Sequence, residues 1–342
     1  MKDYFGTFLG NESIKKRLSY DVEHNSVSHA FILEGNEGSG RHTLALQLAS
    51  AISCKNKSAA SLPCGKCEAC KKILSGKSPD VINLGIASDK VTIGIETARL
   101  IKESIHISPN DLPIKMYIIE DAEKMTLQAQ NALLLSLEEP PQYVIFILIC
   151  KDSTALLETI KSRAPILHLE KLSTEDIESY LLDKYQKARQ IKDEFPKEFS
   201  ELLLASGGTL GRAIDLLDDR DRKKEMAERE IARKFIDCSL DRSRASKFEM
   251  ISSLGSKRHD ITPRLVRIQH ALRDLIILKK ADSPELVFYS DVEYASELST
   301  KFTLERLMDM YTAIAKAIDD LTANANIRLC LLSMMYASNL LD

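Results

Sequence analysis

Four cysteines lie close together in the sequence, at a spacing that suits a metal ion. They are Cys54, Cys64, Cys67 and Cys70, in the pattern C-x9-C-x2-C-x2-C, with Pro63 and Gly65 as turn residues. Four thiolates bind Zn2+ in a tetrahedron, at about 2.3 Å per Zn–S bond, and leave no open position for water. Cysteines repeated at three-residue intervals are rarely incidental thiols. The sequence therefore predicts a structural zinc module at residues 54–70.

A glycine-rich segment at residues 35–43, GNEGSGRHT, follows an apolar run and precedes a stretch with helical spacing. Gly35, Gly38 and Gly40 stand where a loop between a strand and a helix can surround a phosphate group with backbone N–H groups. Two interpretations stay open. The glycines either form a tight turn and nothing more, or they also bind a nucleotide weakly.

The residues after the last glycine depart from the phosphate-loop pattern GxxxxGK[ST]. In that pattern the lysine reaches the β and γ phosphates and the hydroxyl holds Mg2+. Arg41 and His42 occupy these two positions here, and Thr43 lies one residue late. Arginine keeps the charge but is a planar fork, and neutral histidine is a poor ligand for Mg2+, which prefers oxygen. Both departures weaken catalysis and make ATP and Mg2+ doubtful as cofactors.

An acidic pair ends another apolar run, in the segment MYIIEDAEKM. Glu120 and Asp121 stand in the order opposite to Asp then Glu, which is the usual order in a nucleotide-hydrolysing site. A shorter carboxylate at the second position would polarise the attacking water less well. We therefore do not expect efficient hydrolysis by this chain.

Short apolar runs in the first half of the chain alternate with stretches of helical spacing. The runs are AFILE, VINL, MYIIE, YVIFILIC and PILHL, and each is typical of a buried strand. Ala129, Leu133 and Leu137 form a stripe that predicts one of the intervening helices, which should end at Glu138 and Glu139 because prolines follow. This alternation predicts an α/β domain with a parallel sheet and flanking helices.

The strand pattern stops after His168, and the rest of the chain has helical spacing. Ser173, with Asp176 three residues later, predicts the start of a helix. The charged run at residues 218–230 is typical of a solvated helix or a linker. We expect three parts, namely the α/β domain at 1–170, a small helical domain at 171–219 and an all-α domain at 220–342.

Composition limits the classes of function. With 47 Lys and Arg against 50 Asp and Glu, the net charge of −3 disfavours a chain that coats nucleic acid by itself. The longest apolar run, from Tyr143 to Cys150, is much shorter than the roughly 20 residues of a membrane-spanning helix. The first residues lack the continuous apolar core of a secretory signal, so we expect a cytoplasmic protein.

Several of these motifs occur in the order seen in bacterial clamp loaders of the AAA+ class, which the sequence resembles over most of residues 5–215. The motifs are SHAFILEGNEGSG, the four-cysteine insert, KMYIIEDAEKM, AQNALLLSLEEPP and IKSRA. The resemblance implies an AAA+ P-loop domain, a helical lid and a helical collar that joins subunits into a ring. Within this family, the delta-prime class of DNA polymerase III subunits tolerates a degenerate phosphate loop, and the sequence is most similar to that class.

The resemblance also suggests roles for individual residues. The family carries an interface arginine in a Ser-Arg-Cys motif, which residues 162–164 match with alanine in place of cysteine. Arg163 would act as an arginine finger on ATP held by a neighbouring subunit, an effect that can be worth several powers of ten in rate. Arg212 corresponds to a second sensor, and Lys151 or Asp152 to a first. The alternative for Arg163 is a surface arginine after a helix, and Arg212 could equally be a solvated helix residue.

The function implied is that of a non-catalytic subunit in the DNA polymerase III holoenzyme. Its partners would be the gamma/tau motor subunits, delta, the sliding clamp and, through the complex, primed DNA, with no membrane. One alternative is an active gamma/tau-like motor subunit, in which Arg41 and Thr43 replace the missing lysine and hydroxyl. Another is a zinc-dependent DNA-binding module, which the charge balance disfavours.

Overall fold

The computed structural model describes residues 3–56, 61–86, 90–241, 243–281 and 285–338. The chain divides into two compact units. The first consists of Met1–Asp176 with Thr209–Gly211, and the second of Ile177–Gly208 with Arg212–Asp342.

The first unit alternates strands and helices. Its strands are β1 (Asp3–Tyr4), β2 (Ala30–Glu34), β3 (Ser61–Leu62), β4 (Val81–Leu84), β5 (Lys115–Ile119), β6 (Val144–Cys150) and β7 (Ile166–His168). Its helices are α1 (Glu12–Glu23), α2 (Arg41–Ser53), α3 (Glu68–Leu74), α4 (Ile95–Ser104), α5 (Leu127–Glu138) and α6 (Glu158–Lys161), with short 3-10 helices η1 (Ala122–Lys124) and η2 (Ser153–Ala155). All the strands predicted from apolar runs are confirmed. The short strands β1 and β3 were not predicted.

The predicted strands form one parallel sheet in the order β4-β5-β6-β2-β7. Ile32 of β2 is aligned with Leu148 of β6 on one side and with Ile166 of β7 on the other. Helices connect the strands, because a parallel pair requires a crossover connection. A parallel sheet in this order, with helices on both faces, is the AAA+ P-loop type of fold, which confirms the predicted fold class. The two short strands β1 and β3 form a separate parallel pair.

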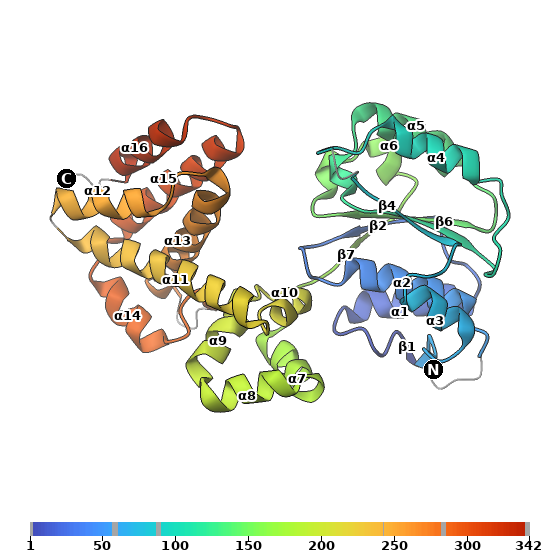
Figure 1. The fold of residues 1–342 in the computed structure, drawn as a ribbon, viewed down its shortest axis with the longest axis horizontal. Helices are drawn as coiled ribbons and strands as arrows, with labels where there is room; N and C mark the ends of the chain where they lie inside the picture. Colours follow the sequence, from blue (N-terminus) through green and yellow to red (C-terminus); the bar gives the residue numbers. More distant parts are fainter. Residues whose placement is uncertain (1–2, 57–60, 87–89, 242, 282–284, 339–342) are drawn as a thin grey trace. The chain divides into compact units, whose positions relative to one another are not determined.

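Each face of the sheet has its own hydrophobic core, because successive side chains of a strand point to opposite faces. Phe31 and Leu33 pack with residues of α1, α2 and α3, whereas Ala30 and Ile32 pack with residues of α4, α5 and α6. Figure 1 shows these two helical layers, with the sheet between them. The stripe predicted within residues 129–137 is buried in the second core. Since both faces are covered, polar groups of the sheet reach a ligand only at the strand ends.

The second unit is helical. Its helices are α7 (Thr174–Lys184), α8 (Gln186–Glu194), α9 (Pro196–Ala205), α10 (Leu210–Asp215), α11 (Asp219–Leu240), α12 (Arg244–Ser253), α13 (Arg258–Leu278), α14 (Val292–Thr300), α15 (Leu304–Thr322) and α16 (Ile327–Ala337), of which α7 and α10 begin in residues of the first unit. Ser173 caps α7 as predicted, because its hydroxyl accepts a hydrogen bond of 3.1 Å from the N–H of Asp176. One hydrophobic core joins residues of α11 to α16. The division of the chain into three parts stays a prediction.

The charged run at residues 218–230 corrects one expectation. It forms the first half of α11, where Arg222, Glu225 and Arg229 are buried at positions spaced three and four residues apart. These side chains share one face of the helix, and that face is not solvated. The sequence did not reveal this because most partners of the buried charges lie far away in the sequence, such as Arg267 of α13 for Glu225 and the carbonyl of Phe288 for Arg229.

Within the described residues, no helix combines the length and the apolar character that crossing a membrane requires.

Candidate metal centre and nucleotide site

The four clustered cysteines come from neighbouring elements of the first unit. Cys54 directly follows α2, and Cys64 lies shortly after β3. Cys67 precedes α3, and Cys70 belongs to its first turn. Pairing of β3 with β1 holds this segment in place. The chain therefore folds back so that the spacing of the motif becomes a cluster in space.

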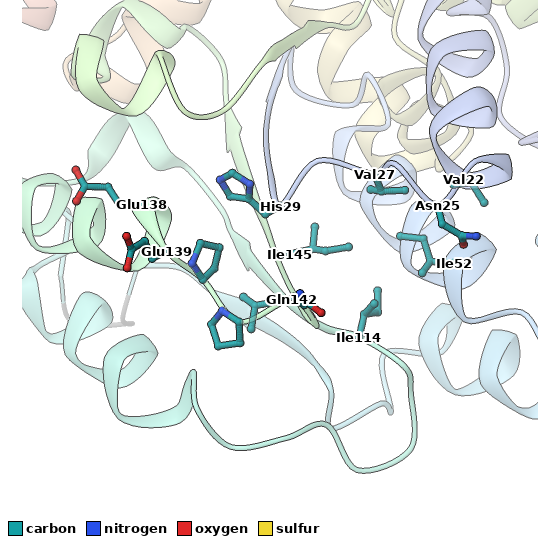
Figure 2. Close-up of a pocket in the computed structure, with 13 residues that line it drawn as sticks. Val22, Asn25, Val27, His29, Ile52, Ile114, Glu138, Glu139, Gln142 and Ile145 are labelled. Atoms are coloured by element: carbon teal, nitrogen blue, oxygen red, sulfur yellow. The ribbon is translucent and has the colours of Figure 1, made fainter.

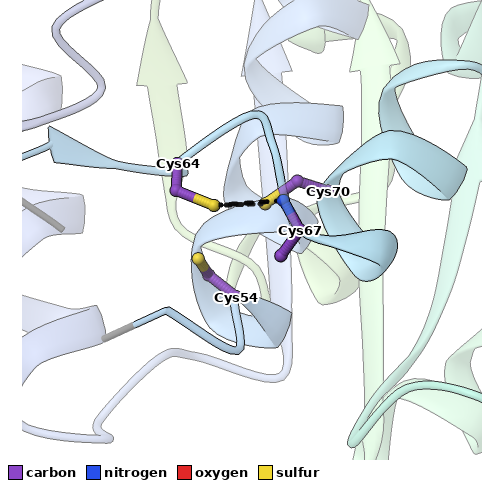
Figure 3. Close-up of side chains that lie close together, drawn as sticks. All are labelled: Cys54, Cys64, Cys67 and Cys70. Carbon is purple, nitrogen blue, oxygen red and sulfur yellow. Dashed lines mark hydrogen bonds between the residues drawn. The ribbon is translucent and has the colours of Figure 1, made fainter. Parts of the chain in front are cut away.

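The sulfur atoms of the cluster lie at distances that fit zinc. All four Sγ atoms lie within 4.8 Å of one another, and the Sγ atoms of Cys64 and Cys70 are 4.0 Å apart. An ideal tetrahedron with Zn–S bonds of 2.3 Å separates its sulfurs by about 3.8 Å. Figure 3 shows the cluster between the end of α2 and the start of α3. The donor set and its spacing fit a structural zinc ion held by these four residues.

Local hydrogen bonds prepare two of these thiols to bind a cation. Burial opposes the Cys67 thiolate, but backbone hydrogen bonds from Cys70 and Lys55 outweigh it and lower the pKa of Cys67 to about 6. The backbone N–H of Cys67, 3.4 Å from Cys64 Sγ, lowers the pKa of Cys64. Burial raises the pKa of Cys54 and of Cys70. Metal binding would therefore displace protons mainly from Cys54 and Cys70.

The glycine loop has the backbone geometry that a strand-to-helix turn requires. Gly38 and Gly40 have φ angles of +78° and +90°, which residues with a side chain rarely adopt. A Cβ on Gly40 would lie 2.9 Å from Cε2 of Phe8. The hydroxyl of Ser39 is buried and has no hydrogen-bond partner within the described residues. The loop therefore offers both a close backbone approach and an unused polar group, as a phosphate site does.

The two residues at the magnesium positions bind each other. His42 Nδ1 forms a hydrogen bond with Oε1 of Glu120. A carboxylate can only accept, so Nδ1 carries the proton. Asp121 has a φ angle of +50°, and its carboxylate pairs with Lys124 at 3.1 Å. His42 and Glu120 thus lie at one site, but both carboxylates of the acidic pair contact side chains of the same chain.

The candidate arginine finger lies away from this loop. Arg163 precedes β7 at its amino end, whereas the glycine loop follows the carboxyl end of β2. Because β2 and β7 are parallel neighbours, Arg163 and the loop lie at opposite ends of the same strand pair. Its guanidinium donates to Oε1 of Glu138 at 2.8 Å and to the carbonyl of Thr159 at 2.8 Å. Arg163 is therefore badly placed to act on its own loop.

The candidate second sensor, Arg212, is held by a buried carboxylate of the second unit. Its Nη2 lies 2.9 Å from Oε2 of Glu225, whose side chain is 4% exposed. Arg267 from α13 also donates to both oxygens of this carboxylate. Burial raises the pKa of Glu225, but Arg267 and Arg212 outweigh it and hold this pKa below its ordinary value. Glu225 therefore joins three helices of the second unit.

The two candidates for the first sensor have local roles. Lys151 Nζ pairs with Glu37 of the glycine loop at 3.1 Å, although both side chains are largely exposed. Asp152 caps η2 by accepting a hydrogen bond of 2.8 Å from the N–H of Thr154, and this bond lowers the pKa of Asp152. Of the two, Lys151 is the residue that contacts the loop.

A pocket of about 530 Å³ lies at the amino ends of the sheet strands, opposite the end at which the glycine loop follows β2 (Figure 2). His29 and Val144 line it, and they stand at the amino ends of β2 and β6. Glu138 and Glu139 line it as well. The glycine loop follows the carboxyl end of β2, so this pocket is not the nucleotide site. The sequence predicts neither the pocket nor the pairing of Glu138 with Arg163, and the LEEPP motif is the one signal in the sequence that marks this region.

Comparisons with known proteins find similarity in the part of the chain that holds the loop, the cysteines and Arg163. Residues 10–173 match the family model described as DNA polymerase III, delta subunit. DNA polymerase III subunit gamma of Buchnera aphidicola subsp. Acyrthosiphon pisum is 32% identical over 215 residues, which cover 63% of this chain and 58% of that protein. DNA polymerase III subunit tau of Bacillus subtilis is 32% identical over 216 residues, 63% of this chain and 37% of that protein.

The match spans less than two thirds of the length of these relatives. Among solved structures, a gamma-subunit-related protein of Thermotoga maritima aligns with 95% of this chain and 99% of its own, at 18% identity and a TM-score of 0.45. The names of the two sequence relatives are gamma and tau, which favours the predicted alternative, a motor subunit, over the delta-prime class. By sequence, residues 10–173 are thus similar to the DNA polymerase III delta-subunit family, and the chain is similar to DNA polymerase III gamma and tau subunits over part of its length.

Proposed function

We propose that this chain is a clamp-loader subunit that hydrolyses ATP poorly and supplies Arg163 to ATP held by an adjacent motor subunit. This is the delta-prime type of role. Its partners would be gamma/tau and delta subunits, the sliding clamp and, through the complex, primed DNA. It would work in the cytoplasm, with a zinc ion on the four cysteines and the helical collar as its contact with other subunits.

The observation that carries this proposal is the bond between His42 and Glu120. These residues stand where a hydroxyl and a carboxylate would hold Mg2+. A histidine that binds the carboxylate leaves the cation without two oxygen ligands, and Mg2+ is essential to phosphoryl transfer because it neutralises developing charge. Arg163, at the opposite end of the strand pair, fits a role on another chain's nucleotide.

A motor subunit is the second candidate, because the sequence relatives are gamma and tau subunits. In that case Arg41 would reach the phosphates and Thr43, which is exposed at the start of α2, would supply the hydroxyl. Turnover by the isolated chain separates the two candidates.

The test measures steady-state ATP hydrolysis by the purified chain and by a clamp loader reconstituted with its partner subunits, clamp and primed DNA. We expect no turnover by the chain alone. Arg163→Ala in the reconstituted complex should lower the DNA-stimulated rate at least tenfold, because an arginine finger stabilises transition-state charge. Magnesium-dependent turnover by the chain alone would establish the motor role, and an unchanged rate with Arg163→Ala would remove the finger.

A further inference from the structure

Three hydrogen bonds within its own chain hold the guanidinium of Arg163. Two of them join it to residues close in the sequence, and the third joins it to a different helix. Nη1 donates to the carbonyl of Thr159 at 2.8 Å and to the hydroxyl of Ser162 at 3.3 Å. Both acceptors belong to the turn that leads to Arg163. Nη2 donates to Oε1 of Glu138 at 2.8 Å, and Glu138 is the last residue of α5. Among these contacts, Glu138 alone fixes the guanidinium relative to a separate element.

These bonds leave donors of the guanidinium available. A guanidinium has five N–H donors, and the three bonds leave at least two of them without an acceptor. Within the described residues, the N–H of Nε has no hydrogen-bond partner. Nε–H and an N–H of Nη2 can together bind two oxygens of a phosphate group. Glu138 thus orients the fork and leaves Nε–H available to a ligand.

The exposure of the pair argues against a role in stability. The side chains of Arg163 and Glu138 are 34% and 45% exposed, and pairs this exposed contribute little to folding. Holding a charged group in place before the reaction saves the cost of ordering it during the reaction. We therefore expect the Arg163–Glu138 pair to increase the rate of ATP hydrolysis and to contribute little to the stability of the fold.

We propose that Glu138 is a positioning residue for Arg163, which holds the guanidinium through Nη2 and leaves Nε–H available to a ligand. The inference rests on the proposed function, in which Arg163 contacts ATP of an adjacent subunit. Glu139 provides a matched control, since it follows Glu138 at the same end of α5 (Figure 2) and forms no ion pair within the described residues.

The experiment compares Glu138→Ala, Glu138→Gln, Glu139→Ala and Arg163→Ala in the reconstituted clamp loader with primed DNA. We expect Glu138→Ala to lower kcat for ATP about two- to fivefold, which is the range that one exposed pair can supply, with KM nearly unchanged. Glu138→Gln should recover part of the loss, because its amide oxygen still accepts the bond from Nη2. Glu139→Ala should behave as the wild type, and complex formation and the thermal midpoint should be the same for all variants.

The double variant Glu138→Ala/Arg163→Ala completes the design. It should be no slower than Arg163→Ala, because Glu138 acts only through the arginine. The inference is overturned if Glu138→Ala equals Glu139→Ala, if it raises the rate, or if it slows the Arg163→Ala complex by the same factor. These outcomes, with Arg163→Ala itself slow, would leave the proposed function intact. An unchanged rate with Arg163→Ala would instead remove both.

Discussion

His42 Nδ1 donates a hydrogen bond to Oε1 of Glu120, which joins the first turn of α2 to the residue after β5. Both side chains stand at positions from which a phosphate loop and its acidic strand bind Mg2+. A magnesium ion would have to break this bond, and it would gain an imidazole, which it binds poorly.

The first prediction concerns this bond. Addition of Mg2+ should change nucleotide affinity of the wild-type chain little, whereas His42→Thr should gain roughly tenfold with Mg2+, because it frees Glu120 and adds a hydroxyl ligand. Titration with a fluorescent ATP analogue, in Mg2+ or in EDTA, measures both. His106→Thr, a change of an exposed histidine, serves as the control. A wild-type chain that already binds nucleotide much more tightly with Mg2+ would contradict the prediction.

The second prediction concerns the metal. The purified chain should contain one equivalent of zinc, and Cys64→Ser should lose it, because a hydroxyl is a far weaker ligand than a thiolate. Elemental analysis by mass spectrometry gives the stoichiometry. Cys238→Ser, which changes a half-buried cysteine outside the cluster, should retain the metal. Equal zinc content in the two variants would show that the cluster does not hold it.

The third prediction concerns the pH dependence of zinc affinity. Because burial raises the pKa of Cys54 and Cys70, both are protonated at neutral pH and must release protons on binding. Affinity should therefore rise with pH through the neutral range, and it should fall further below about pH 6, where Cys67 also takes up a proton. Competition with a chromophoric chelator across this range tests the slope. An affinity independent of pH would mean that the thiols are already ionised.

The fourth prediction concerns Glu225. Glu225→Gln should destabilise the chain by about 3 kcal/mol at neutral pH, because it leaves Arg212 and Arg267 beside a buried neutral group. The folded-state pKa is lowered from 4.5, so the contribution of the charge is present above that pH and is lost as the pH falls through the folded-state value. The two proteins should therefore converge in acid.

Calorimetry at several pH values measures this difference. Glu230→Gln on the same helix, where the side chain is 51% exposed, should shift the transition by much less. A transition of Glu225→Gln equal to that of Glu230→Gln would show that the buried network is not stabilising.

Patterns within short sequence segments were sufficient to predict most of the structure of the first unit. Apolar runs predicted every strand of the five-stranded sheet, and cysteine spacing predicted the cluster. The strands β1 and β3 have two residues each, too few for any periodicity to show. They form only because the cysteine-containing segment returns to the amino-terminal residues.

Contacts between distant residues account for what was missed. The motif pattern placed His42 and Glu120 at one site, but their mutual bond depends on side-chain directions that no spacing specifies. The charged run at residues 218–230 was expected to be a solvated helix or a linker, but its Glu225 is buried. Arg212 and Arg267, from other helices, supply the opposite charges that allow this burial.

The opposite placement of the glycine loop and Arg163 on one strand pair has a consequence for assembly. A two-fold dimer brings identical patches together, so the patch with the arginine would face itself and never the loop. If Arg163 serves a neighbour's nucleotide, the contact is heterologous, and copies of such a fold can only follow one another with a fixed polarity. An open series of this kind has two different ends. A subunit that presents an interface arginine to its neighbour, but whose own glycine loop lacks the residues for hydrolysis, is suited to the end at which its own loop needs no arginine from a neighbour.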